Sequence, residues 1–190
     1  NSSDQRRQNV ERAAELEDGW LVAPGEVFSF VECVGGISEE EGFAVGFGIV
    51  SNGQGGVTTA PVVGGGVCQV STTLFHAVFW AGLPVLERYT HPYWLTSYGD
   101  PPSGMLGLDA MIDVQEDYAL DFKFQNTTGN WIAVDMEADG TNLVVKILGT
   151  NPRWTIQVDE PVITDVKQPD TTIHYEDSPE LPKGDERQVE

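Results

Sequence analysis

The sequence has little positive charge, few sulfur and imidazole side chains, and no long apolar run. Its 190 residues include 10 Lys and Arg against 30 Asp and Glu, which gives a formal net charge of −20. Nucleic acids and anionic membrane surfaces are themselves negative, so this charge argues against both as partners. It is compatible with a secreted protein, a halotolerant protein, or one that meets cationic or neutral substrates.

The chain also lacks any stretch near the ~18 consecutive apolar residues of a membrane-spanning helix. A basic start followed by an apolar centre, the pattern of a signal peptide, is missing as well. The chain begins with Asn1 rather than Met. We therefore expect an anchor or export signal to have been removed with the residues that preceded Asn1, and we expect the present chain not to span a membrane.

Cysteine is scarce, with Cys33 and Cys68 as the two examples. Two alternatives stay open for them, one disulfide or two free thiols, because a single pair does not define a disulfide framework. A disulfide would prevent Cys68 from acting as a resting nucleophile. The paired cysteine spacing that is typical of zinc sites is missing, so we predict no metal ion and no other cofactor.

The length is sufficient for one domain with a substantial core and a short appended segment. We predict that residues 1–150 form this domain. From residue 151 onward the composition shifts toward Pro, Asp and Glu, with few large apolar side chains. Residues 151–190 are therefore expected to form an extended acidic tail or the start of a truncated C-terminal β module, with residues 154–158 as one more strand.

The spacing of apolar residues predicts an α+β fold. Helical spacing covers residues 4–19 and returns from residue 67 to the stop signal at Gly82. Alternation of apolar and polar residues predicts strands over residues 26–31, 119–124, 130–138 and 142–149. The glycine-interrupted run at residues 42–63 is expected to be a flexible approach to the second helix. That apolar helix would pack on a mostly antiparallel sheet, in an arrangement similar to that of transglutaminases and cysteine peptidases.

Three glycines, residues 64–66, lead directly into the apolar helix and place Cys68 in its first turn. Unpaired backbone N–H groups and the positive end of the helix dipole favour a thiolate there. The same N–H groups of residues 67–69 are suited to stabilise an oxyanion, and the side chain of Gln69 is a further candidate donor. Cys68 is therefore a candidate nucleophile. The alternative is a small buried side chain that only fills the core.

A histidine and an aspartate follow Cys68 in an order similar to that of transglutaminase-like thiol enzymes. His91 comes after the helix in a short aromatic run, and Asp109 opens the next expected strand. In this arrangement His91 would accept the thiol proton, and Asp109 would hold the imidazole in the required tautomer. Such trios are recognised by geometry, so the order permits a catalytic trio without establishing it.

The candidate substrate-binding residues flank Cys68 and His91 in the sequence. They are Gly65, Gly66, Ser71, Thr72, Tyr93 and Trp94. The two hydroxyl residues either line the pocket or bond to the backbone. The aromatic residues, together with Tyr98, form either a wall for a sugar or peptide or part of an ordinary strand pair.

Five motifs together resemble the VanW-like family. They are PGEVFSF at residues 24–30, GGGVCQVSTTLFHA at residues 64–77, AGLPVLER at residues 81–88 followed by His91, GLDA at residues 107–110, and DFKFQN at residues 121–126. The match covers about residues 10–149. Residues 166–190 resemble the beginning of the extracellular G-five domain, which often follows VanW-like domains.

The resemblance implies a bacterial protein exported to the cell envelope, and anchored to membrane or wall through segments outside this sequence. The family is named from vancomycin resistance clusters, so the implied partner is a cell-wall peptide or glycan. No settled reaction comes with the family. Its motif does include the residues that correspond to Cys68, His91 and Asp109, which supports a functional trio.

Two hypotheses from different classes remain. The first is a thiol-dependent acyl transferase or amide hydrolase that acts on peptidoglycan peptides or envelope proteins through Cys68. The second is a non-catalytic module that binds peptidoglycan or supports the envelope, in which Cys68 is packing and His91 a structural hydrogen-bonding residue. The oligomeric state does not follow from the sequence.

Overall fold

The computed structural model describes residues 4–51, 57–99, 106–115, 117–150, 154–159 and 161–167. Contacts divide the chain into two compact units, Asn1–Asp159 and Glu160–Glu190. In the second unit the described residues, 161–167, form neither helix nor strand. The G-five-like resemblance therefore falls almost entirely outside the described residues.

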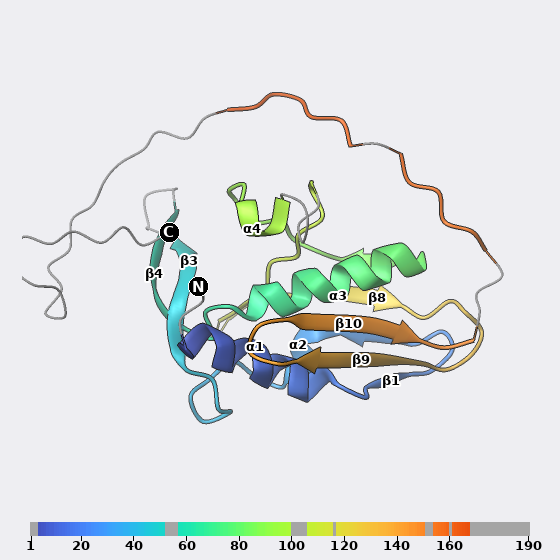
Figure 1. Cartoon of the computed structure of the whole chain (residues 1–190), viewed down its shortest axis with the longest axis horizontal. Helices are drawn as coiled ribbons and strands as arrows, with labels where there is room; N and C mark the ends of the chain where they lie inside the picture. Colours follow the sequence, from blue (N-terminus) through green and yellow to red (C-terminus); the bar gives the residue numbers. More distant parts are fainter. Residues whose placement is uncertain are drawn as a thin grey trace, which may run out of the picture. The chain divides into compact units, whose positions relative to one another are not determined.

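Helices and short strands mix along the first unit (Figure 1). The helices are α1 (Asp4–Glu17), α2 (Phe30–Val34), α3 (Val67–Ala81) and α4 (Thr96–Gly99). The strands are β1 (Leu21–Val22), β2 (Val27–Ser29), β3 (Val45–Ser51), β4 (Val57–Val63), β5 (Val85–Glu87), β6 (Asp113–Val114), β7 (Ala119–Leu120), β8 (Lys123–Gln125), β9 (Ile132–Ala138) and β10 (Leu143–Leu148). All pairs of strands are antiparallel within the described residues, which confirms the α+β class.

The apolar helix α3 begins and ends where the sequence predicted. Gly66 at its N-cap has a φ of 115° and Gly82 at its C-cap has a φ of 69°, backbone conformations that favour glycine. Val70, Leu74 and Val78 are fully buried. Because they are four residues apart, they lie on one face of the helix and direct that face into the core.

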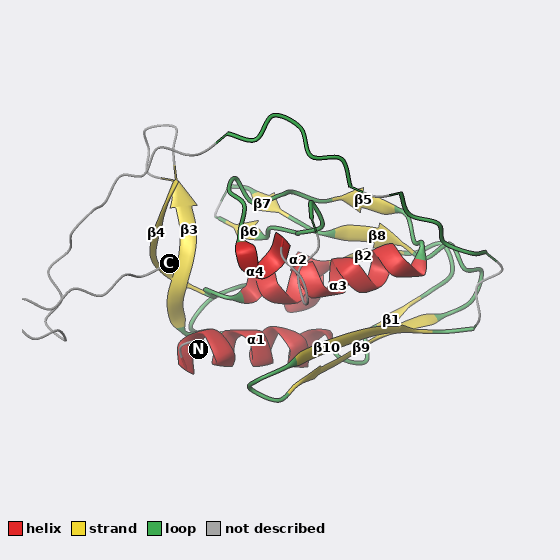
Figure 2. Ribbon diagram, turned by 45° about the horizontal axis from the view of Figure 1, so that its top comes forward, coloured by secondary structure: helices red, strands yellow, loops and turns green. Residues whose placement is uncertain are grey.

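Two three-stranded sheets lie on either side of α3. Their strand orders are β1-β9-β10 and β2-β8-β5. Figures 1 and 2 show α3 running between β8 and β10. The turn between β9 and β10 contains the pair Asp139–Gly140, a common hairpin-turn sequence, and Gly140 has a φ of 78°. The antiparallel strands expected in the second half of the chain are therefore confirmed.

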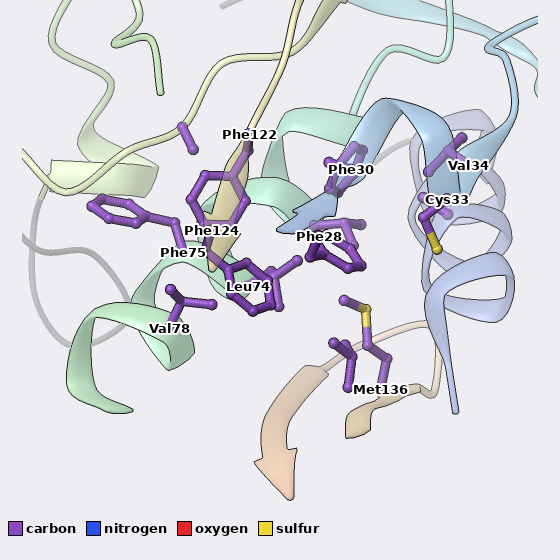
Figure 3. Close-up of a cluster of buried hydrophobic side chains, with 14 of the residues drawn as sticks. Phe28, Phe30, Cys33, Val34, Leu74, Phe75, Val78, Phe122, Phe124 and Met136 are labelled. Carbon is purple, nitrogen blue, oxygen red and sulfur yellow. The ribbon is translucent and has the colours of Figure 1, made fainter. Parts of the chain in front are cut away.

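Aromatic side chains from separate elements meet in the core (Figure 3). Phe28 of β2 stacks on Phe124 of β8 with ring centres 4.9 Å apart, and Phe75 of α3 meets Phe122 at 5.6 Å, close to edge-on. All four rings are buried. Burial of side chains of this size stabilises the fold by ~1.5–3 kcal/mol each. The aromatic cluster thus holds α3 against the β2-β8-β5 sheet.

The strand predicted over residues 26–31 is too long. Strand β2 ends at Ser29, and the short helix α2 follows it. The Ser29 hydroxyl caps this helix by accepting the backbone N–H of Glu32 at 3.1 Å, and Gly35 ends it with a φ of 76°. Serine at the N-cap and glycine after the last turn are standard helix boundaries, and here they outweigh the alternation of apolar residues.

The alternation of apolar and polar residues over residues 119–124 assigns Asp121 to the solvent-facing side of a strand, and this assignment is wrong because the residue is buried. One carboxylate oxygen accepts the backbone N–H groups of Val31 at 3.0 Å and Phe122 at 2.7 Å, and the other accepts the Ser29 hydroxyl at 2.6 Å. These bonds supply acceptors to the start of α2. They also interrupt the strand predicted over residues 119–124, which divides into β7 and β8.

Two further predictions are corrected. Residues 42–63 are not simply a flexible approach, because most of them form the antiparallel hairpin β3–β4. Residues 154–158 are not a strand. In that segment the Trp154 indole donates to the carbonyl of Ala81 at 3.0 Å, so the chain packs across the end of α3 instead of joining a sheet.

Glu17 is fully buried at the end of α1, and within the described residues neither of its carboxylate oxygens has a hydrogen-bond partner. Burial, and then the nearby charge of Asp121, raises the pKa of Glu17 well above its usual range. At a pH above the ordinary pKa of a glutamate, the Glu17 carboxyl loses its proton in the unfolded chain but keeps it in the folded chain. The free energy of unfolding therefore decreases as the pH rises above that value.

We expect Glu17→Gln to stabilise the fold at pH 7, because an amide needs no proton uptake on folding. Urea unfolding at pH 7 and pH 4.5 measures this gain, which should shrink at the lower pH. Glu15→Gln, on the exposed side of the same helix, is the matched control. Equal effects of the two substitutions would contradict the prediction.

Candidate functional site

Cys68 is the second residue of α3 and is half-buried, which confirms its predicted place in the first helical turn. Its Sγ lies 3.4 Å from the backbone nitrogen and 3.5 Å from the carbonyl oxygen of Ile112. A thiol donates to that carbonyl, whereas a thiolate accepts from that N–H. Cys33 and Cys68 are both free thiols, which resolves the alternatives left by the sequence.

His91 and Asp109 form a bonded pair. Nδ1 of His91 lies 2.7 Å from Oδ2 of Asp109, and the same oxygen accepts the backbone N–H of His91 at 2.7 Å. The His91 side chain is only 5% exposed. Since Asp109 holds Nδ1, Nε2 is the ring nitrogen available to the Cys68 sulfur. Cys68 is close enough to influence the imidazole. The three residues predicted as a trio therefore lie together.

The charge state of the pair follows from these contacts. Burial alone would lower the pKa of His91, but hydrogen bonds to Asp109 and Cys68 outweigh it and raise that pKa to about 9. Burial alone would raise the pKa of Asp109, yet its bonds to His91 lower it. An imidazolium beside a carboxylate is therefore the favoured state near pH 7. A positive group next to a thiol favours the thiolate.

Ser71 and Thr72 anchor the strand-like segment that carries Asp109. The Ser71 hydroxyl donates to the carbonyl of Ala110 at 2.7 Å, and the Thr72 hydroxyl accepts the Ala110 N–H at 3.0 Å. Both residues are buried. Of the two alternatives for these hydroxyls, the structure has them bonded to the backbone; a direct role in substrate binding stays a prediction.

The same helix face bonds to the chain on both sides of Ala110. The His76 ring bonds to the carbonyl of Leu108, and Cys68 contacts Ile112. Residues 108, 110 and 112 thus face α3, since two residues of extended chain span about as far as one helical turn. Asp109 lies between two of these contacts, which hold its backbone in place, and its carboxylate bonds to His91.

The amides expected to hold an oxyanion are partly occupied. The N–H of Val67 donates to the carbonyl of Gly64, and that of Gln69 donates to the carbonyl of Gly66, both at 2.9 Å. The Cys68 amide is the remaining member of the group. An oxyanion site built on it would need a second donor, for which the Gln69 side chain stays the candidate.

Arg6 of α1 connects two parts of the site. One guanidinium nitrogen lies 3.1 Å from Oε1 of Gln69 and 3.4 Å from the hydroxyl of Tyr98. The Tyr98 ring in turn packs on the His91 ring with centres 5.1 Å apart. Burial, and then the nearby charge of Cys68, raises the pKa of Tyr98 to about 12. Neutral Tyr98 therefore covers the imidazole and shields it from water.

The other candidate substrate residues lie around this centre. Tyr93 and Trp94 are 42% and 56% exposed, and the Tyr93 hydroxyl donates to the carbonyl of Val57 in β4 at 3.1 Å. Both aromatic rings therefore remain accessible to a ligand.

Gly65 has a structural role in the turn. A side chain on Gly65 would lie 2.6 Å from the backbone nitrogen and oxygen of Phe47, so only glycine fits there.

Sequence reasoning missed the residues of α1 that support the site. Asn9 is fully buried, and its amide donates to the carbonyls of Ala44 at 2.9 Å and Gly65 at 3.0 Å. It thereby fixes the glycine turn ahead of Cys68. A buried Asn inside an amphipathic helix is the one signal that could have identified it, because buried polar side chains require partners. Nothing local marks Arg6.

Cys33 provides an internal comparison. It is buried beside α1, where its thiol contacts the carbonyl of Leu16 at 3.6 Å. Burial, followed by the charges of Glu17 and Glu32, raises the pKa of Cys33 far above its usual range. An unreactive thiol is therefore available in the same chain as the candidate nucleophile.

Among the described residues no helix is long and apolar enough to cross a membrane, and no three His, Cys, Asp or Glu side chains come together as metal ligands.

Comparison with known sequences places this site in a family context. The family model described as VanW like protein matches residues 5–148. The chain is 32% identical over 154 residues to the uncharacterized protein YoaR of Bacillus subtilis, covering 79% of this chain and 45% of that protein. It is 31% identical over 134 residues to the vancomycin B-type resistance protein VanW of Enterococcus faecalis, covering 68% of this chain and 45% of that protein.

The chain thus spans less than half the length of both relatives. No solved structure matches it. The likeness to transglutaminases and cysteine peptidases therefore has no support from a structural neighbour, and the site has to be interpreted from its own geometry.

Proposed function

The chain belongs to the VanW-like protein family, and we propose that it is a thiol-dependent acyl transferase or amide hydrolase of the cell envelope. The observation that carries this proposal is the hydrogen bond between His91 and Asp109, with the Cys68 thiol next to the same imidazole. A base oriented by a third group next to a nucleophile is the general signature of covalent catalysis.

The proposed reaction has two steps. The Cys68 sulfur attacks an amide carbonyl, a carbon–sulfur bond forms, and the amine leaves with a proton from the His91 imidazolium. Water or a second amine then attacks the thioester, gives a proton to His91, and releases the Cys68 thiolate. Asp109 keeps the imidazole oriented throughout. The backbone N–H of Cys68 and the side chain of Gln69 are the proposed donors to the oxyanion.

The proposed substrates are peptidoglycan peptides or envelope proteins. Support comes from the vancomycin resistance for which the Enterococcus faecalis relative is named and from the export that the family resemblance implies. The exposed rings of Tyr93 and Trp94 would contact a peptide or glycan chain.

The pH dependence of iodoacetamide alkylation, read by peptide mass spectrometry, tests for the activated thiol. We expect Cys68 to be alkylated in the native protein, while the buried thiol of Cys33 stays unmodified. Incubation with purified peptidoglycan stem peptides and an acid quench should then reveal an acyl group on Cys68. Absence of this acyl group from the wild-type protein would overturn the proposal. An unchanged level of protein acylation in the Cys68→Ser variant would overturn it as well.

One observation supports a second function. The contacts of Cys68 with both backbone groups of Ile112 would also serve a purely structural thiol. The protein would then be a non-catalytic module that binds peptidoglycan through its exposed aromatics. Binding to purified sacculi that survives Cys68→Ala but is lost in Trp94→Ala would favour this function over catalysis.

A further inference from the structure

The hairpin β3–β4 is a sheet of only two strands, and it stands at the end of α3 where that helix begins (Figures 1 and 2). In the described part of the chain, neither strand pairs with a third. A two-stranded ribbon has two outer edges, each with backbone N–H and C=O groups directed away from the partner strand. The two edges of this ribbon differ in whether they can accept another strand.

The register shows which groups point outward. The N–H of Gly64 donates to the carbonyl of Ala44, and the pairing continues from there as an antiparallel ladder. Hydrogen-bonded pairs alternate with non-bonded pairs, so the pair of Phe47 with Pro61 falls in a non-bonded position. Proline, which has no N–H, fits such a position. The backbone groups of Phe47 and Ile49 therefore point away from β4.

The outer edge of β4 is closed. Pro61 has no N–H to offer there, and the outward carbonyl of Val57 accepts the Tyr93 hydroxyl at 3.1 Å. Proline is one of the devices by which natural proteins prevent an edge strand from pairing further.

The outer edge of β3 carries none of these devices. The strand contains no proline and no charged residue, although the whole chain has a net charge of −20. Val45 and Phe47 are 46% and 50% exposed. An uncharged, partly apolar edge of this length is a template for strand addition.

This open edge begins at the candidate catalytic site. The glycine turn packs against the start of β3: a side chain on Gly65 would lie 2.6 Å from the nitrogen and oxygen of Phe47, so only glycine fits beside this part of the strand. Cys68 follows three residues later. Strand β3 starts beside the glycine turn, with Val45 opposite Val63, and runs away from it toward Ser51.

We propose that the outer edge of β3 binds an extended peptide as an added antiparallel strand and delivers its carbonyl end to Cys68. The inference rests on the proposed function and names its substrate class: a peptide acyl donor. A peptide antiparallel to β3 runs toward the glycine turn, so its C-terminal side arrives at the thiol. The opposite orientation would present an amine end, and parallel pairing is slightly less stable per residue.

The bound peptide is neutral or cationic, because the edge is uncharged and the whole chain has a net charge of −20. Side chains on one face of the added strand would pack beside Phe47 and Val45, so alternate apolar residues are favoured.

The test uses the probe acetyl-Lys-Val-Lys-Val-Ala chloromethyl ketone, from which the Cys68 thiolate displaces chloride to form a carbon–sulfur bond. Ile49→Pro removes one outward N–H from β3 and leaves the ladder to β4 intact. Thr59→Pro makes the same change on the outer edge of β4, directly opposite in the register. We expect Ile49→Pro to slow probe labelling about tenfold, and Thr59→Pro to leave it unchanged.

Iodoacetamide, which has no peptide, should label Cys68 equally in all three proteins. A second measurement keeps the test valid if Ile49→Pro does not fold: N-methylation of the probe's edge-facing amides should slow labelling of wild type by about the same factor. Labelling that is indifferent to both Ile49→Pro and N-methylation would overturn the inference.

Failure of the edge and failure of the thiol give different results. A fluorescent peptide amide of the same sequence should bind the Cys68→Ala protein and lose affinity in Cys68→Ala with Ile49→Pro. If it does so while wild-type Cys68 is inert to iodoacetamide, the proposed chemistry is wrong and the binding edge stands. If Cys68 is reactive but the peptide does not bind, the edge is wrong and the chemistry stands.

Discussion

Replacing His91 by alanine is expected to lower the rate at which iodoacetamide alkylates Cys68 at pH 7 by about tenfold or more, because the thiolate loses a hydrogen bond to a charged group, which is worth ~1.5–3 kcal/mol. In the wild type, the imidazolium of His91 provides the positive charge that favours the thiolate. The variant loses that charge and its hydrogen bond to Cys68. The lost reactivity should return as the pH is raised above 9.

His76→Ala is the matched control for this experiment. His76 lies on the same helix and bonds to the carbonyl of Leu108, but burial lowers its pKa, so it is neutral near pH 7. The His76→Ala substitution should change the free energy of unfolding without changing how the alkylation rate of Cys68 depends on pH. If the two histidine variants lowered the alkylation rate at pH 7 equally, packing instead of charge would explain the reactivity of Cys68.

The candidate catalytic residues were identifiable in the sequence because their signals are local. A glycine turn followed by an apolar helix places Cys68 in a first helical turn wherever that helix packs. His91 and Asp109 follow from their order along the chain. Their contact was not predictable, since it depends on four residues of α3 that bond to the backbone of residues 108–112.

The supporting residues could not be predicted for the opposite reason. Arg6 and Asn9 lie about sixty residues before the parts of the chain that they contact. Helix α1 has an amphipathic pattern that explains its folding without any role in the site. Only the packing of α1 against the glycine turn gives these two side chains their partners.

The same distinction applies to the fold. Strands β9 and β10 were predicted because alternation and an Asp-Gly turn lie within one short segment. Helix α2 was missed because part of its stabilisation comes from Asp121, about ninety residues later. The β3–β4 hairpin was missed because Gly46 and Gly48 interrupt the apolar pattern of β3. Both glycines are required by close packing, against Gly65 and against Val62.

Asp109→Asn is expected to move the titration of His91 by more than any other single substitution that preserves its contacts. The amide oxygen can still accept both N–H groups of His91, but the negative charge is lost. Burial is the largest single influence on this imidazole and lowers its pKa. Without the Asp109 charge, fewer interactions would remain to raise that pKa. The midpoint, read from the His91 ring protons by NMR, should fall from about 9 to near or below the ordinary value of ~6.5.

The shift has a stability consequence with a definite sign. A histidine whose pKa is raised in the folded state stabilises the fold fully below pH ~6.5, and this stabilisation is lost as the pH rises through about 9. A rise from 6.5 to about 9 corresponds to roughly 3 kcal/mol. Wild type should therefore lose stability across this range, and Asp109→Asn should lose much less. Asp113→Asn is the control, since that carboxylate bonds to Gln115 and Tyr118 instead. A wild-type His91 midpoint near 6.5 would show that no charged pair exists, and the catalytic assignment of Asp109 would fail with it.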